Sequence, residues 1–86
     1  MPTWRELKNH VNDLADDYGV VLENSQKHVT RQPELCLFHI KRGNANVAFA
    51  FTWAELKASH DWRGLVTVHF VEAMRTLKEI VFATSR

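Results

Sequence analysis

The feature that most constrains the fold is a pair of aromatic and β-branched segments in the middle of the chain. Residues 34–41 and 46–51 are separated by a short turn-forming sequence that contains Gly43 and Asn44. Two such segments joined by so short a connection are typical of a β-hairpin. The sequence therefore predicts two antiparallel strands here.

Alternation along this hairpin gives its two faces different compositions, because successive strand residues point to opposite sides. The residues expected to face the core are Cys36, Phe38, Ile40, Val47, Phe49 and Phe51. The residues on the opposite face are Leu35, Leu37, His39, Ala48 and Ala50. This second face is more apolar than a face open to water needs to be. We therefore expect something to cover it.

The segment before the hairpin begins with the periodicity of an amphipathic helix. The apolar residues that recur every three or four positions are Trp4, Leu7, Val11, Leu14 and Tyr18. They predict an amphipathic helix over residues 3–17, with Thr3 and Glu6 as a capping box and Gly19 as its C-terminal stop. Alternation from Tyr18 to Glu23 then predicts a strand, and the polar residues 24–33 predict a loop.

Two further helices are expected after the hairpin. Thr52 and Glu55 repeat the capping-box spacing and predict a short helix that begins near Trp53. The residues of a core stripe that starts after Trp62 are Val66, Phe70, Ala73, Leu77 and Ile80. Residues 65–71 also alternate like a strand, but the length of the periodic segment favours a helix.

These elements predict a single α+β domain over residues 1–86. The expected order is αβββαα, with a three-stranded antiparallel sheet, an N-terminal helix, a short helix and a long C-terminal helix. With 86 residues and 45% hydrophobic content, the chain suits one folded domain, and no apolar run is long enough to span a membrane.

Charge and cysteine content narrow the function class. Eleven Lys and Arg against ten Asp and Glu give a net charge of +1, which is less basic than a dedicated nucleic-acid-binding domain. The single cysteine, Cys36, cannot form an internal disulfide, and the N-terminus has no apolar signal segment. We therefore expect a cytoplasmic protein.

No pattern of catalytic or metal-binding residues emerges. His10, Asp13 and Asp17 lie near one helix face, but no metal-binding motif is present. Cys36 lies in an apolar strand with no activating base, and the three glycines are too widely spaced for a phosphate-binding loop. We assign no catalytic residue, metal ligand or cofactor, and an enzyme is the less favoured class.

The leading hypothesis is a small protein-binding module, such as an adaptor, a subunit, an inhibitor or a homodimer. Trp53 and Trp62 flank the short helix, where they either anchor an interface or fill the core. The residues expected to bind a protein partner are Leu35, Leu37, Ala48, Ala50, Trp53 and Trp62. Val68, Val71 and Phe82 form a further apolar row on the last helix.

The alternative is an RNA-binding or RNA-cleaving module. The basic residues that could contact phosphates are Lys27, His28, Arg31, Lys41 and Arg42. The element order resembles double-stranded-RNA-binding domains and the HicA-type toxin ribonucleases, which place two helices on one face of a three-stranded sheet. That resemblance implies RNA contacts, although the Gly-Ser-His-His segment of the toxins has only residues 24–28 as a counterpart.

Overall fold

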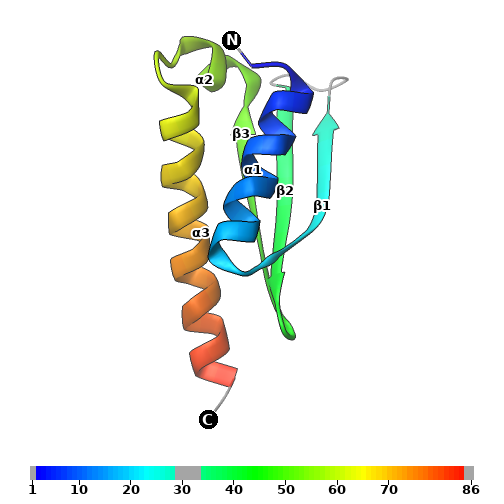
Figure 1. Cartoon of the computed structure of the whole chain (residues 1–86), viewed down its shortest axis with the longest axis vertical. Coiled ribbons are helices and arrows are strands. Elements are labelled where there is room, and N and C mark those ends of the chain that lie inside the picture. The colour runs from blue at the N-terminus through cyan, green and yellow to red at the C-terminus, as the bar shows by residue number, and fades with distance from the viewer. Residues whose placement is uncertain (1, 29–33, 85–86) are drawn as a thin grey trace.

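The computed structural model describes residues 2–28 and 34–84, and all of their side chains except those of residues 28 and 81–84. Figure 1 shows the elements in chain order: α1 (Trp4–Tyr18), β1 (Val21–His28), β2 (Leu35–Arg42), β3 (Ala45–Thr52), α2 (Trp53–Ala58) and α3 (Trp62–Thr84). The αβββαα order expected from the sequence is confirmed. Residues 65–71 belong to α3, so the helical interpretation of that segment is correct.

Both capping boxes form as the sequence predicts. The Glu6 amide donates to Thr3 Oγ1 at 3.1 Å, and the Thr3 amide donates to Glu6 Oε1 at 3.2 Å. Thr52 and Glu55 make the same pair of bonds at the start of α2. Gly19 ends α1 with a φ of 67°, the left-handed conformation that favours glycine.

The sheet has the strand order β1-β2-β3, with both pairs antiparallel. β2 and β3 are joined through Gly43, at a φ of 60°, and Asn44, so the predicted hairpin is confirmed. β1 differs from the prediction, because residues 24–28 continue the strand and do not belong to a loop. Pairing with β2 satisfies the backbone groups that point toward it, and polar side chains are tolerated on an edge strand.

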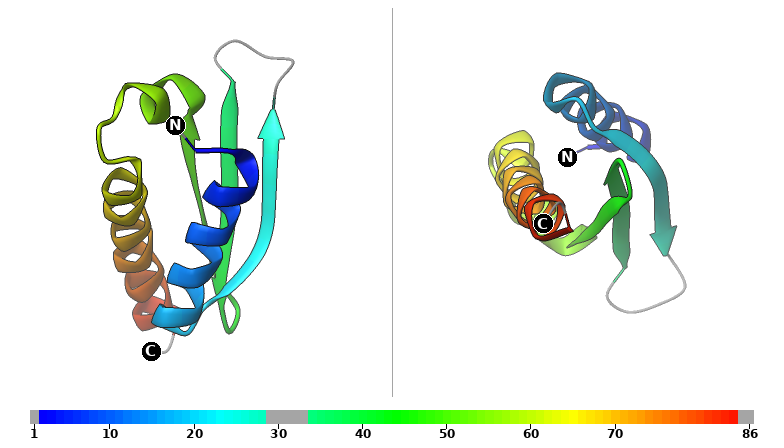
Figure 2. Two further views of the ribbon diagram at one scale, coloured as in Figure 1. Left: turned by 45° about the horizontal axis from the view of Figure 1, so that its top comes forward. Right: turned by 90° about the horizontal axis from the view of Figure 1, so that it is seen from below.

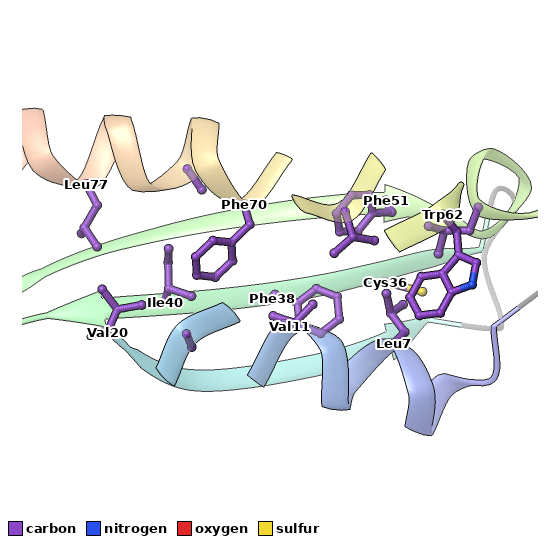
Figure 3. Close-up of a cluster of buried hydrophobic side chains, with 14 of the residues drawn as sticks. Leu7, Val11, Val20, Cys36, Phe38, Ile40, Phe51, Trp62, Phe70 and Leu77 are labelled. Carbon is purple, nitrogen blue, oxygen red and sulfur yellow. The ribbon is translucent and has the colours of Figure 1, made fainter. Parts of the chain in front are cut away.

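The helices α1 and α3 lie on the same side of the sheet (Figure 2). The core fills the space between them and the sheet, and Phe38, Phe51 and Phe70 are its largest fully buried side chains (Figure 3). The expected core face of the hairpin is confirmed for Cys36, Phe38, Ile40 and Phe51, which are at most 1% exposed. Val47 and Phe49 are half-buried and pack against the same cluster.

The hairpin turn gives a direct test of backbone strain. A β-carbon added at Gly43 would meet no atom within 4 Å, so only the positive φ opposes a side chain there. We expect Gly43→Ala to lower the free energy of unfolding by about 1 kcal/mol. Asn44→Ala is the matched control in the same turn and should cost less, because Asn44 does not have a positive φ. Urea unfolding of the two variants measures the difference, and equal costs would contradict the explanation.

Candidate protein-binding surface

The face of the sheet opposite the helices is open. No helix within residues 2–28 and 34–84 lies on it (Figure 2). Leu35, Leu37 and His39 are partly exposed, and Ala48 and Ala50 are exposed. The expectation that this face is covered is therefore not met by any helix that the structure describes. We call the surface formed by Leu35, Leu37, Ala48 and Ala50 the open sheet face.

The open sheet face has a ridge and a trough. Leu37 on β2 pairs with Ala50 on β3, and His39 pairs with Ala48. Adjacent strands are about 4.8 Å apart, so large side chains on β2 stand directly beside small ones on β3. An apolar surface with this relief suits a partner with complementary relief, since close packing requires matched shapes.

Mostly polar residues border this apolar surface, together with Val21, which pairs with Lys41 and is 62% exposed. On the same side of the sheet, the register places Asn24 and Gln26 on β1, and Lys41 and Asn46 at the hairpin end. Among the described side chains that the register places on this side, none is Phe, Tyr or Trp, and His39 is the only ring. The border therefore matches the rim of a protein interface, and this side offers a single imidazole where RNA-binding sheets carry two or three stacking rings.

The two tryptophans do not extend the open sheet face. Trp62 is only 9% exposed and belongs to the core, with the Arg63 guanidinium 4.4 Å from its ring centroid. Trp53 is half-buried and packs against the same core, and Lys27 Nζ lies 4.9 Å from its ring centroid. The structure therefore favours the core-filling alternative for Trp62, and Trp53 has only part of its ring available to a partner.

The apolar row on α3 lies on the helix side of the molecule. Val68 is 57% exposed and Val71 is half-buried, whereas the side chain of Phe82 falls outside the described residues. This row is separated from the open sheet face by the thickness of the sheet (Figure 2). The two apolar sets that the sequence predicts therefore belong to different surfaces.

The predicted basic surface is divided between two ends of the sheet. Lys27 pairs with Cys36, and Arg42 lies six residues further along β2, a separation of about 20 Å. Lys27 covers Trp53, while Arg42 Nη2 donates to the Tyr18 carbonyl oxygen at 2.7 Å and so caps the end of α1. Arg31 and the side chain of His28 lie outside the described residues.

A groove that the sequence analysis did not identify lies at the hairpin end of the helix side. The residues that line it are Tyr18, Arg42, Val71, Met74, Arg75 and Lys78. We call it the basic groove, and its volume is about 430 Å³. The helical spacing of its four α3 residues was visible in the sequence, but their proximity to Tyr18 and Arg42 depends on the tertiary fold.

The Cys36 thiol and the His10 imidazole, two candidate groups for catalysis, both take part in packing or in contacts between helices. Burial of Cys36, which is 1% exposed, raises the pKa of its thiol to about 11, so it is protonated at neutral pH. His10 Nε2 lies 3.2 Å from both the Arg63 carbonyl oxygen and Thr67 Oγ1, which joins α1 to α3. Within the described part of the chain, no three His, Cys, Asp or Glu residues are placed to hold a metal ion.

Comparison with known proteins provides no relative from which a function could be transferred. No protein-family model matches the chain, and no curated protein or solved structure matches it. In the part of the chain that the structure describes, no helix is long and apolar enough to cross a membrane. Function must therefore be argued from the surfaces described above.

The raised pKa of Cys36 predicts a pH dependence of stability. The folded pKa of about 11 exceeds the ordinary value of 9.0, so the folded state prefers the neutral thiol. This preference has its full effect below pH 9 and is lost as the pH rises toward 11. We expect the free energy of unfolding to fall more steeply over this interval in the wild type than in Cys36→Ala. Parallel urea titrations test this, and identical slopes would contradict it.

Proposed function

We propose that this protein is a non-catalytic protein-binding module that docks through its open sheet face. The observation that carries the proposal is that α1 and α3 both cover one side of the sheet, which leaves Leu35, Leu37, Ala48 and Ala50 facing outward. Covering apolar surface contributes about 25 cal/mol for each Å² removed from water. A partner that covers this face would remove these apolar side chains from water, which the described helices of the chain do not do, and that burial would stabilise the complex.

A second copy of the chain is the partner that best fits this relief. A twofold axis that runs parallel to the strands, between β2 and β3, would place Leu37 of one copy over Ala50 of the other. The same operation would place each His39 over the other copy's Ala48. Each ridge then enters a trough, which is the self-complementarity that a twofold interface requires.

Electrostatics oppose this arrangement only weakly. The axis would bring Lys41 of one copy over Asn46 of the other, since these residues are paired in the register, and it would place the two Lys41 side chains at the same level, about one strand spacing apart. The net charge of +1 also leaves little overall repulsion between copies. The like-charge contact that this axis creates on β2 is between the two Lys41 side chains, which lie at the hairpin end and can extend toward water.

The same observations make RNA the weaker candidate. Sheet surfaces that bind RNA use two or three aromatic side chains to stack bases, whereas the described open sheet face offers leucine and alanine, with His39 as the one ring beside them. Lys27 and Arg42 lie at opposite ends of the sheet, so they do not form one continuous basic surface. Both points favour an apolar protein partner.

The proposal predicts self-association that one substitution on the open sheet face weakens. Multi-angle light scattering of the wild type should give a mass twice the 10.0 kDa of the chain at high concentration. Ala50→Glu would place a carboxylate against Leu37 of the other copy, and we expect the dimer Kd to rise at least about tenfold, or roughly 1.4 kcal/mol.

The matched control is Ala54→Glu, because Ala54 is also exposed but lies on α2. It should leave the dimer Kd unchanged. Thermal unfolding of both variants checks that neither has lost its fold. A wild-type protein that remains a monomer at about millimolar concentration would contradict the proposed self-association, since a Kd that weak corresponds to only about 4 kcal/mol.

A further inference from the structure

The basic groove combines an apolar floor with a cationic border. Tyr18 is 42% exposed, although one part of its ring packs against Phe70 with the centroids 5.5 Å apart. Val71 and Met74 are half-buried beside it. At about 430 Å³, the groove is within the range of about 300 to 1,000 Å³ that is usual for ligand clefts. It can therefore accept a large apolar side chain.

Three cations surround this floor without an acidic partner. Arg42, Arg75 and Lys78 line the groove, and no lining residue is acidic. Among the described residues, none of these three cations forms an ion pair. Arg42 uses one of its five N–H groups on the Tyr18 carbonyl, which fixes the guanidinium and leaves other donors for a ligand. The groove is thus complementary to negative charge.

The spacing of these cations matches that of acids on a helix. Arg75 and Lys78 lie three positions apart on α3, which places their β-carbons about 5 to 6 Å apart on one face. Carboxylates three or four positions apart on a partner helix have the same separation. Methionine in the floor adapts to side chains of different shape, as it does in surfaces that accept amphipathic helices.

We propose that the basic groove binds an acidic amphipathic helix of another protein. An apolar side chain of that helix enters between Tyr18 and Met74, and its carboxylates pair with Arg42, Arg75 and Lys78. The apolar floor favours a peptide over the phosphate backbone of RNA, which would need polar groups there. Because the groove lies on the helix side, this inference does not depend on the open sheet face.

The test is an NMR titration of the ¹⁵N-labelled full chain with a designed peptide. The peptide has about 20 residues, so that it can form a helix, with leucines on one face and glutamates flanking them. We expect shift changes centred on Tyr18, Val71 and Met74, and binding that weakens as salt is added. A second peptide with lysine at each glutamate position should not bind, because its charge repels the groove.

Charge reversal identifies the residues responsible. Arg75→Glu combined with Lys78→Glu should weaken peptide binding at least about tenfold, since it replaces two attractions by two repulsions. The matched control, Arg5→Glu with Lys57→Glu, makes the same change in net charge at exposed positions outside the groove and should leave binding intact.

Three results would overturn the inference. The first is no binding of the acidic peptide at low salt, and the second is equal weakening by the two double variants. The third is tighter binding of single-stranded or duplex RNA than of the peptide, with loss of RNA binding in Arg75→Glu/Lys78→Glu, which would assign the groove to nucleic acid. Circular dichroism of each variant confirms that the fold is retained.

Discussion

The packing of α1 and α3 against the same face of a three-stranded sheet is the interaction on which the remaining structure depends. Phe38 lies at its centre, with ring contacts to Trp4, Phe49 and Phe51. A chain of 86 residues has little apolar material, and this arrangement concentrates it in one core. The consequence is asymmetry, because one side of the sheet is sealed and the other is left to water or to a partner.

Local chemistry explains why much of the fold could be predicted. The capping boxes at Thr3 and Thr52 and the turn at Gly43 involve residues close in sequence, so their outcome hardly depends on the rest of the chain. The length of β1 could not be predicted in this way. Its polar residues 24–28 are extended because β2 supplies hydrogen-bond partners from a distant part of the chain.

The candidate surfaces differ in how much of each can be predicted from the sequence. The open sheet face follows from simple alternation, so its residues can be predicted from the sequence alone. Whether Trp62 was buried depended on the space between α1 and α3, which no local pattern reveals. The basic groove unites Tyr18, Arg42 and α3, and its cations come together only through tertiary packing.

The two surfaces give the molecule opposite faces of different chemistry. The open sheet face is apolar with a polar border, and the basic groove is apolar with a cationic border. An acidic helix bound in the groove would not obstruct a second copy on the sheet, because the sheet lies between them (Figure 2). In this account, one module joins two different kinds of partner.

The most direct test of the central claim is an isotope-filtered NOE experiment on a mixture of ¹³C-labelled and unlabelled chains. It detects only contacts between different copies. The account predicts cross-peaks from the Leu37 methyl groups of one copy to the Ala50 methyl group of the other. Cross-peaks that instead join residues on the helix side, or none at all in a concentrated sample, would contradict the assignment of the open sheet face as the interface.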